Sequence, residues 1–309
     1  MPIASARPKV LIVGGGISGS AVAYELAQRG ATSIVAEREP TLASHASGRS
    51  AAQWGPDEGG PVAIAAGPIF DRWSRELRSP GFFTPRPTLF VDTDEVDEID
   101  KLLTRYARGR SMILTPHERR WTGAAPEVLE VSPEAAVHLF PLLDSRKIRR
   151  AALDRRDMDI DSHRIVRVLA KGVRQLGGQI RVNAPVTDVV KRGSSWLVQA
   201  GDDTVTCDMV VNAAGAWADQ ISELAGVSIQ GVRPLRRSTF LARLPHLMRP
   251  HRQTPLLVWG KSGAYVRWAP EADLYGSPAD VEPSPPGDPR PNDDAIEQAL
   301  RSLAAITRL

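Results

Sequence analysis

One stretch near the start of the chain constrains the fold more than any other. From Val10 it reads VLIVGGGISGSAVAYELAQRGATSIVAERE. The apolar run 10–13 is typical of a buried parallel strand, and residues 17–28 repeat apolar side chains at helical spacing. Gly30 stands where a helix commonly ends, and residues 33–36 read as a second strand. A strand, a glycine turn, a helix and a strand in this order predict a mononucleotide-binding unit.

The glycines of the turn have the spacing of a dinucleotide-binding loop. Gly14, Gly16 and Gly19 match G-x-G-x-x-G. The first permits the tight turn, the second lets a phosphate approach the backbone, and the third packs the helix on the strand. A pyrophosphate would sit against the free N–H groups of the helix N-terminus. Glu37 ends the second strand, where a carboxylate accepts hydrogen bonds from a ribose diol. The alternative is a glycine-rich turn that happens to precede a helix.

The chain then departs from the plan of a nicotinamide-binding domain, which normally continues with further strand–helix units. Residues 40–61 read as a loop of small residues and 62–77 as a helix, and the chain returns to the sheet only after Asp157. Two-domain flavoproteins have this interrupted plan, because extended FAD needs a second loop at a strand end. A nicotinamide-dependent dehydrogenase stays open as an alternative that rests on the glycine loop only.

The rest of the chain predicts two further groups of elements. The first group continues the dinucleotide unit. It begins with a helix that is capped by Asp161 or Ser162 and has an apolar face that includes Leu176. Strands follow at 179–182, 186–190, 196–199 and 204–206, and residues 208–221 form a buried strand, a small-residue turn and a helix. The second comprises a strand at 88–92, a helix at 94–108, short helices and turns in 115–141, strands at 233–244, 256–259, 263–268 and 273–276, a proline-rich loop at 278–291, and a helix at 293–307 capped by Asn292.

These elements predict an α/β protein with an α+β second domain. The first domain has the interrupted plan expected for FAD binding, and the second is built on a mostly antiparallel sheet. The family resemblance given below implies that the first is a Rossmann-like FAD-binding domain and the second a substrate domain. We assign residues 1–80 and 150–228 to the FAD-binding domain and residues 81–149 and 229–292 to the substrate domain. Residues 293–309 form a terminal helix.

Composition excludes several classes. The net charge is only +3, and lysines and arginines are scattered, which argues against a nucleic-acid partner. Cys207 is the single cysteine, so no internal disulfide forms, and we expect a reducing cytoplasm and a packing role for this thiol. No signal peptide, membrane span or metal-ligand spacing is recognisable.

Three segments in order, VLIVGGGISGSAVAYELAQRGATSIVAERE, HASGRSAA and VVNAAGAWAD, resemble the D-amino-acid-oxidase-like family of FAD-dependent oxidoreductases. Within this family the chain is most similar to the D-arginine dehydrogenase type of D-amino-acid dehydrogenase, which also has counterparts of PRPTLFVD, DIDSHRI, PLRRSTF and LYGSPAD. The resemblance covers essentially the whole chain. It implies noncovalent FAD and a small-molecule substrate, an amino acid (a D-amino acid in the nearest type) or a related amine. It also implies hydride transfer from the substrate Cα to flavin N5, giving an imino acid that hydrolyses to a keto acid.

The resemblance also assigns roles to individual residues. Arg236 and Tyr265 match an arginine and a tyrosine that hold the substrate α-carboxylate. From the residues alone, Arg236 reads as a solvated arginine on a sheet edge. Tyr265 reads equally as half-buried packing, and Trp217 equally as a core residue at a helix start. The residues that match cofactor contacts are Gly14, Gly16, Ile17, Ser18, Gly19, Glu37, Arg38, Ser44, Ser47, Gly48, Arg49, Ser50, Ala51, Ala52, Val186, Ala213, Ala214, Gly215 and Trp217.

The chain departs from the D-arginine dehydrogenase type at two places. Thr88 stands where that type has a glutamate that receives the substrate guanidinium, and Gln53 and Glu58 match its histidine and tyrosine. We therefore expect no preference for D-arginine, with the alternative that Glu58 faces a substrate cation. Family members also continue past the last helix into a segment with a second carboxylate-binding arginine and a glycine-rich loop under the flavin, and we expect this segment to be absent. A truncated form, or a natural short form completed by a partner subunit and without catalysis on its own, stays open.

Overall fold

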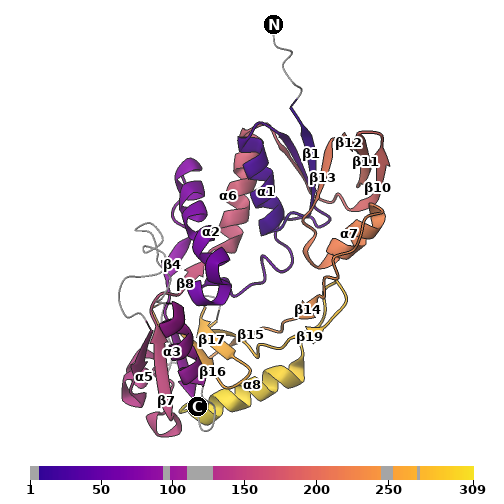
Figure 1. The fold of residues 1–309 in the computed structure, drawn as a ribbon. Helices are drawn as coiled ribbons and strands as arrows, with labels where there is room; N and C mark the ends of the chain where they lie inside the picture. Colours follow the sequence, from indigo (N-terminus) through magenta and orange to yellow (C-terminus); the bar gives the residue numbers. More distant parts are fainter. Residues whose placement is uncertain (1–6, 93–97, 110–127, 245–252, 270–271) are drawn as a thin grey trace. The chain divides into compact units, whose positions relative to one another are not determined.

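The chain divides into two units in the computed structural model, which describes residues 7–92, 98–109, 128–244, 253–269 and 272–309 (Figure 1). Unit 1 comprises Met1–Ala52, Phe70–Phe82 and Asp161–Pro234. Unit 2 comprises Gln53–Ile69, Phe83–Ile160 and Leu235–Leu309. Each unit has its own sheets and its own buried core.

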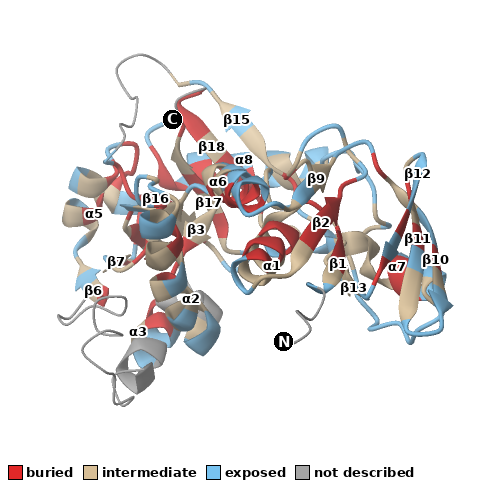
Figure 2. Ribbon diagram, turned by 90° about the horizontal axis from the view of Figure 1, so that it is seen from above, coloured by how far each residue is buried: buried red, intermediate tan, exposed pale blue. Residues whose placement is uncertain are grey.

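Unit 1 is built on a four-stranded parallel sheet in the order β13-β1-β2-β9. Its helices α1 and α6 pack against each other, and Figure 2 shows the buried residues of α1 and β2. Helix α1 has the predicted bounds and is followed by Gly30 at φ +87°, and the Asp161 carboxylate caps α6 by accepting the N–H of Arg164 at 2.8 Å. The elements are β1 (Lys9–Val13), α1 (Ile17–Gln28), β2 (Thr32–Ala36), α6 (Ser162–Gln175), β9 (Gln179–Arg181) and β13 (Met209–Asn212).

A three-stranded antiparallel sheet completes unit 1, formed by β10 (Val186–Arg192), β11 (Ser195–Ala200) and β12 (Asp203–Cys207). Cys207 is buried in its core, and burial raises the pKa of this thiol. The short helix η2 (Gly215–Trp217) and α7 (Ala218–Leu224) follow β13. Two expectations were wrong. Strand β13 is not buried, because it is the edge strand and Met209 is 54% exposed. Leu176 is 40% exposed, because α6 ends before it.

Unit 2 is built on a seven-stranded sheet in the order β15-β18-β17-β16-β5-β7-β6. Neighbouring strands are antiparallel except for β16 and β5, so the sheet is mostly antiparallel, as predicted. The strands are β5 (Thr88–Asp92), β6 (Val128–Val131), β7 (Arg150–Asp154), β15 (Phe240–Ala242), β16 (Leu256–Trp259), β17 (Ala264–Trp268) and β18 (Leu274–Ser277).

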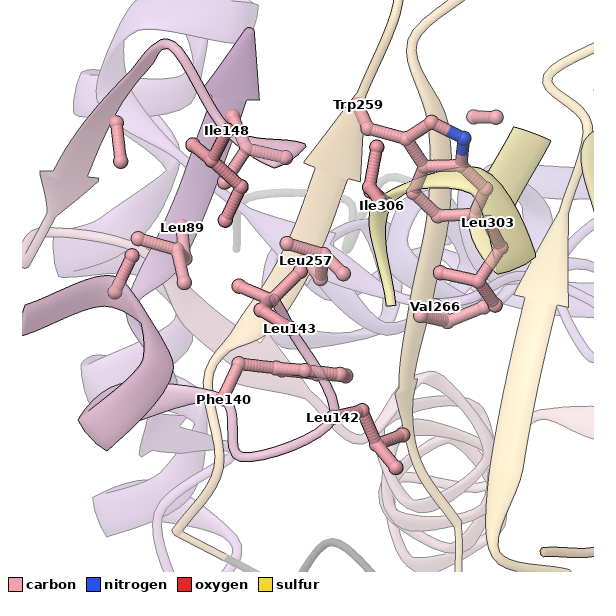
Figure 3. Packing of buried hydrophobic residues seen from close by; sticks show 14 of the residues in the cluster. Leu89, Phe140, Leu142, Leu143, Ile148, Leu257, Trp259, Val266, Leu303 and Ile306 are labelled. Atoms are coloured by element: carbon pink, nitrogen blue, oxygen red, sulfur yellow. The ribbon is translucent and has the colours of Figure 1, made fainter. Parts of the chain in front are cut away.

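One face of this sheet carries the core of unit 2 (Figure 3). Leu257, Trp259 and Val266 project from the sheet, and Leu303 and Ile306 of helix α8 (Asp293–Ile306) pack against the same cluster. Burying each of these side chains contributes about 1.5–3 kcal/mol. Helix α5 (Pro133–Leu139) and the short helix η1 (Ser145–Lys147) frame the segment that supplies Phe140, Leu142 and Leu143.

Small sheets connect the remaining segments of unit 2. Strand β8 (Met158–Ile160) pairs with both β3 (Gln53–Trp54) and β4 (Phe83–Pro85), and β14 (Leu235–Arg236) pairs with β19 (Glu282–Pro283). Helix α2 (Pro56–Glu76) contributes to both units and has a non-helical residue at Gly60, and α3 (Glu98–Gly109) follows β5.

Several predicted loops contain structure. Residues 40–61 include β3 and the start of α2, residues 278–291 include β19, and β6 lies where we expected helices and turns. Positions 94–97 and 115–127 lie outside the described residues. The units also differ from the predicted domain bounds, because residues 53–69 and 150–160 fall in unit 2. The reason is strand pairing, since β3 and β8 join β4 whereas β7 lies between β5 and β6.

Candidate functional site

The glycine loop of unit 1 packs tightly against the end of β13. Gly14 has φ +108°, and a Cβ there would overlap the carbonyl oxygen of Ala213. A Cβ on Gly19 would overlap the carbonyl oxygen of Gly14. Only glycine fits at either position, the first for its left-handed backbone and the second for the close approach of helix and strand. The loop that ends at Ala213 and Ala214 therefore lies directly beside the first cofactor segment.

Glu37 lies buried at the carboxyl end of β2. Its Oε2 accepts the N–H of Gly15 at 2.6 Å, and its Oε1 accepts the N–H of Glu39 at 2.8 Å. Each carboxylate oxygen can accept more than one hydrogen bond, so both keep capacity for a ribose hydroxyl. The structure places Glu37 as predicted, and it adds Gly15, which sequence reasoning did not single out.

The second segment, residues 41–52, reaches the first turn of α1. Ser47 Oγ accepts the N–H of Ile17 at 3.1 Å. The carbonyl oxygen of Gly48 lies 2.9 Å from His163 Nε2 on α6. His163 is exposed, and the sequence alone gave no signal for this contact, which depends on how α6 packs. Within the segment, Ser44 donates to the Thr41 carbonyl, Arg49 donates to the Ser44 carbonyl, Ser50 accepts the N–H of Ala52, and Ala51 is half-buried.

All three predicted cofactor segments meet at Trp217. The Arg38 guanidinium carbon lies 4.2 Å from the centre of the Trp217 ring, and the His45 ring lies 4.7 Å from it. Glu39 Oε1 joins the two basic groups, at 2.9 Å from both Arg38 Nη2 and His45 Nε2. These hydrogen bonds, that of His45 first, hold the pKa of Glu39 below its usual value. Cation–π contact and ion pairing thus connect the segments that follow β2 and β13.

Three further residues were predicted to contact the cofactor, namely Ala214, Gly215 and Val186. Gly215 begins η2 with φ +55°, and the N–H of Ala214 donates to Asn212 Oδ1 at 3.3 Å. Val186 opens β10, pairs with Ala200 and packs half-buried on the core beneath.

These residues fit FAD. Helix α1 has no side-chain N-cap, so its first-turn N–H groups, including that of Ser18, lack an intrahelical acceptor. The helix dipole favours a phosphate at the same point, next to the small side chains of the glycine loop. The backbone around Gly16 and Ser47 would hold the pyrophosphate, and Glu37 the adenosine ribose. FAD itself supplies the redox chemistry.

In unit 2, Arg236 is already bound to a carboxylate. Its Nη2 forms an ion pair with Glu282, and its Nη1 donates to the carbonyl oxygen of Arg290 at 3.3 Å. Glu282 Oε1 also accepts a hydrogen bond of 2.5 Å from Asn292 Nδ2. The guanidinium thus has the geometry to receive a carboxylate, and a substrate carboxylate would have to replace Glu282.

Tyr265 lies half-buried on β17. Burial raises the pKa of its hydroxyl, with Tyr275 adding to the rise, while a side-chain hydrogen bond with Ser277 and the charges of Arg237 and Arg267 oppose it. The hydroxyl therefore stays protonated at neutral pH and can donate a hydrogen bond.

The positions that depart from the D-arginine dehydrogenase type come together. Gln53 Nε2 donates to Thr88 Oγ1 at 2.6 Å, and Thr88 Oγ1 donates to Asp157 Oδ2 at 2.6 Å. Thr88 and Asp157 are both buried. The side chain of Glu58 lies outside the described residues. Asp157 is therefore a member of this cluster that sequence reasoning did not identify.

The chain belongs to the DAO family of FAD dependent oxidoreductases, whose family model matches residues 9–307. Mouse (Mus musculus) mitochondrial dimethylglycine dehydrogenase is 25% identical over 277 residues, which cover 87% of this chain and 30% of that protein. Glycine oxidase of Geobacillus kaustophilus is 25% identical over 271 residues, covering 84% of this chain and 67% of the enzyme. The crystal structure of glycine oxidase from the same organism superposes with a TM-score of 0.73 at 21% identity, covering 97% of this chain and 78% of that one. The chain therefore has the DAO-type fold and FAD as its cofactor, and it spans less than a third of the dimethylglycine dehydrogenase that it matches.

Two negative findings apply to the described ranges. No cluster of three or more histidine, cysteine, aspartate or glutamate side chains in them has the arrangement of a metal site. Their helices are too short or too polar to cross a membrane.

Proposed function

We propose that this chain carries out FAD-dependent oxidation of the carbon–nitrogen bond of an amino acid or a related amine. The observation that carries the proposal is the convergence of three cofactor segments on Arg38, His45 and Trp217 within one unit. The named activities of the relatives, on glycine and dimethylglycine, support an amine substrate. The sequence resemblance favours a D-amino acid within this class.

The residues of the chain would bind and orient the substrate. Noncovalently bound FAD would accept the hydride from the substrate carbon, and the imino product would hydrolyse to a keto acid. Tyr265 and Arg236 are our candidates for holding the substrate carboxylate, Tyr265 as a neutral donor and Arg236 after release of Glu282. Such exchange costs little, because ion pairs with a solvent-exposed partner are weak, with a median near zero to about 1 kcal/mol.

The test is direct. The purified protein is loaded with FAD, its flavin absorbance is recorded, and bleaching of the flavin is followed with D- and L-amino acids and N-methylated glycines. We expect tight retention of FAD and bleaching by at least one carboxylate-bearing amine. Failure to retain added FAD, or the absence of bleaching with every amine in the panel, would sink the proposal.

A second candidate is an FAD-binding protein that needs a partner subunit for turnover. The observation in its favour is the small share, 30%, of dimethylglycine dehydrogenase that the chain matches. FAD retention without bleaching by any amine would support this candidate. Bleaching by the isolated chain would exclude it. We place either activity in the cytoplasm, on the ground that the single cysteine is buried and reduced.

A further inference from the structure

The sheet of unit 2 has a second face, opposite its apolar core. Val266 lies in the core, so alternation along β17 puts Tyr265 and Arg267 together on the other face. Tyr265 pairs with Ser277 and Arg267 with Tyr275 on β18, which adds a hydroxyl and an aromatic ring to this face.

Thr88 lies in the same row across the sheet as Arg267. Leu257 on β16 pairs with Val266 on the antiparallel strand β17, so Arg267, the next residue of β17, lies opposite Leu256, the preceding residue of β16. Leu256 in turn pairs with Thr88 on β5. The cluster of Gln53, Thr88 and Asp157 therefore approaches the same face from β5, while Tyr265 occupies the next row.

Arg267 is the more weakly paired of the two arginines that share one acid in this region. The nearest acid is Asp159, whose Oδ2 lies 2.5 Å from Nε of Arg86. Arg86 is only 5% exposed and also donates to the Thr254 carbonyl, so its position is fixed, and it pairs closely with the partly exposed Asp159. Arg267 reaches the same oxygen only at 3.8 Å, too far for a hydrogen bond.

The Arg267 side chain also has unused hydrogen-bonding capacity. Its Nε is buried and has no hydrogen-bond partner among the described residues. The side chain is 23% exposed, so a ligand can reach it, and its guanidinium carbon lies 5.4 Å from the centre of the Tyr275 ring. Asp157 accepts hydrogen bonds from Thr88 and Gln53. Arg237 adds further positive charge near Tyr265.

We propose that Arg267 binds a second carboxylate of the substrate, so that the preferred substrates are dicarboxylic amino acids. This inference rests on the proposed function, in which Arg236 and Tyr265 hold the α-carboxylate. Arg236 lies on the separate two-stranded sheet of β14 and β19, whereas Arg267 lies on the large sheet, so the two guanidinium groups offer two distinct anion sites. A partly buried guanidinium stacked on a ring is suited to a bidentate carboxylate, and a neutral or cationic side chain would leave its charge uncompensated.

The experiment compares aspartate with asparagine, which differ in the charge of one group. Both enantiomers of each are assayed for flavin bleaching with wild type, Arg267→Gln and Arg267→Lys. We expect kcat/KM of wild type for aspartate to exceed that for asparagine at least about 10-fold. Arg267→Gln should lower kcat/KM for aspartate by about 10- to 100-fold, mainly through KM, and change asparagine less than about 3-fold. Arg267→Lys should recover part of the aspartate activity.

A binding measurement separates this inference from the proposed function. Calorimetric titration with succinate and with succinamate reports on the second carboxylate without turnover. Wild type should bind succinate more tightly, and Arg267→Gln should abolish the difference. Arg150→Gln is the matched control, because Arg150 lies on the same sheet and pairs with Glu130 and Asp100. Arg150→Gln should leave unchanged both the preference for aspartate over asparagine and the preference for succinate over succinamate.

The outcomes are distinguishable. If no amine bleaches the flavin but succinate still binds through Arg267, the proposed function fails and the anion site stands. Equal use of aspartate and asparagine by wild type, or equal losses for both in Arg267→Gln, would overturn the inference. If Arg267→Gln does not fold, Arg267→Lys is used in its place. The inference is then overturned if the folded Arg267→Lys variant keeps the wild-type ratio of kcat/KM for aspartate and asparagine and wild type binds succinate and succinamate equally.

Discussion

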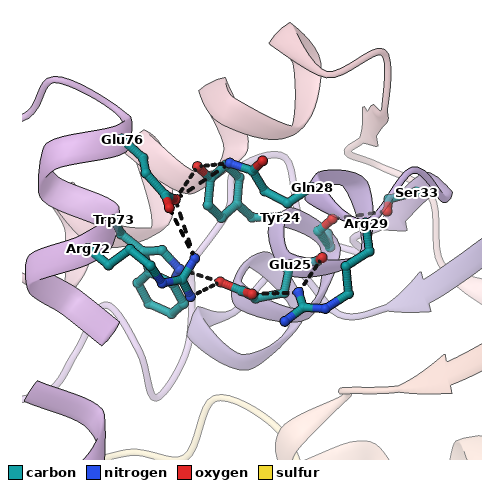
Figure 4. Close-up of polar contacts among 9 residues, drawn as sticks. Tyr24, Glu25, Gln28, Arg29, Ser33, Arg72, Trp73 and Glu76 are labelled. Carbon is teal, nitrogen blue, oxygen red and sulfur yellow. Dashed lines mark hydrogen bonds and ion pairs between the residues drawn. The ribbon is translucent and has the colours of Figure 1, made fainter. Parts of the chain in front are cut away.

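Glu25 on α1 links this helix to α2 within unit 1 (Figure 4). Its Oε1 lies 2.5 Å from Arg72 Nη2 and 2.6 Å from Trp73 Nε1, and its Oε2 lies 2.6 Å from Arg29 Nη1. Partial burial raises the pKa of this carboxyl, but the three donors outweigh it and hold the pKa at about 2. The substitution Glu25→Gln removes the charge and keeps the size of the side chain.

The expected loss follows from this pKa. A fall from 4.5 to about 2 corresponds to about 3 kcal/mol of stability above pH 4.5. The side chain is 23% exposed, so water screens the pairs, and we expect about 1–2 kcal/mol. Because folding lowers the pKa, the contribution is complete above pH 4.5 and disappears as the pH falls toward 2.

The assay is thermal and urea unfolding of wild type and Glu25→Gln between pH 7 and pH 2. We expect Glu25→Gln to lower Tm by about 2–8 °C at neutral pH, with a difference that narrows in acid. The control is Glu297→Gln, which removes a similar pair with Arg301 on α8, where Glu297 is 64% exposed. That variant should change stability by no more than about 0.5 kcal/mol. Equal stability of Glu25→Gln and wild type at pH 7, or a difference that persists at pH 2, would refute the reasoning.

Three other variants test the candidate site. Gly19→Ala forces a methyl group onto the carbonyl of the first loop glycine and should weaken FAD binding at least about 10-fold by fluorescence titration, whereas Ala21→Gly should weaken it far less. Glu37→Gln places an amide donor against one of the two backbone N–H groups that Glu37 accepts, and it should weaken the free energy of FAD binding by about 1–3 kcal/mol. An unchanged affinity for FAD would show that Glu37 does not belong to the cofactor site. Glu282→Gln releases Arg236 from its internal carboxylate and should lower KM for carboxylate substrates, and an unchanged KM would count against a substrate role for Arg236.

Local sequence was sufficient for the elements whose signals are local. The bounds of α1 follow from its apolar spacing and from the glycines at its two ends. Asn292 was predicted as a cap from its position before an apolar helical segment, and Asp161 was one of two candidates with Ser162. The side-chain oxygens of Asn292 and Asp161 accept the backbone N–H groups expected of caps. The glycine loop belongs to the same class, because steric demands on Gly14 and Gly19 arise within one βαβ unit.

Only the tertiary structure decided which strands pair and which charges are compensated. Strands β3, β7 and β8 joined unit 2 through partners far away in the chain, which no local periodicity reports. The same holds for the arginines. Arg236 and Arg267 look alike in sequence, yet the pairing of β19 with β14 brings Glu282 to one, while the buried Arg86 takes the acid nearest the other. The free energy of a charged side chain depends on the groups folded around it, so sequence determined where the arginines stand and the fold decided how closely each one is paired with an acid.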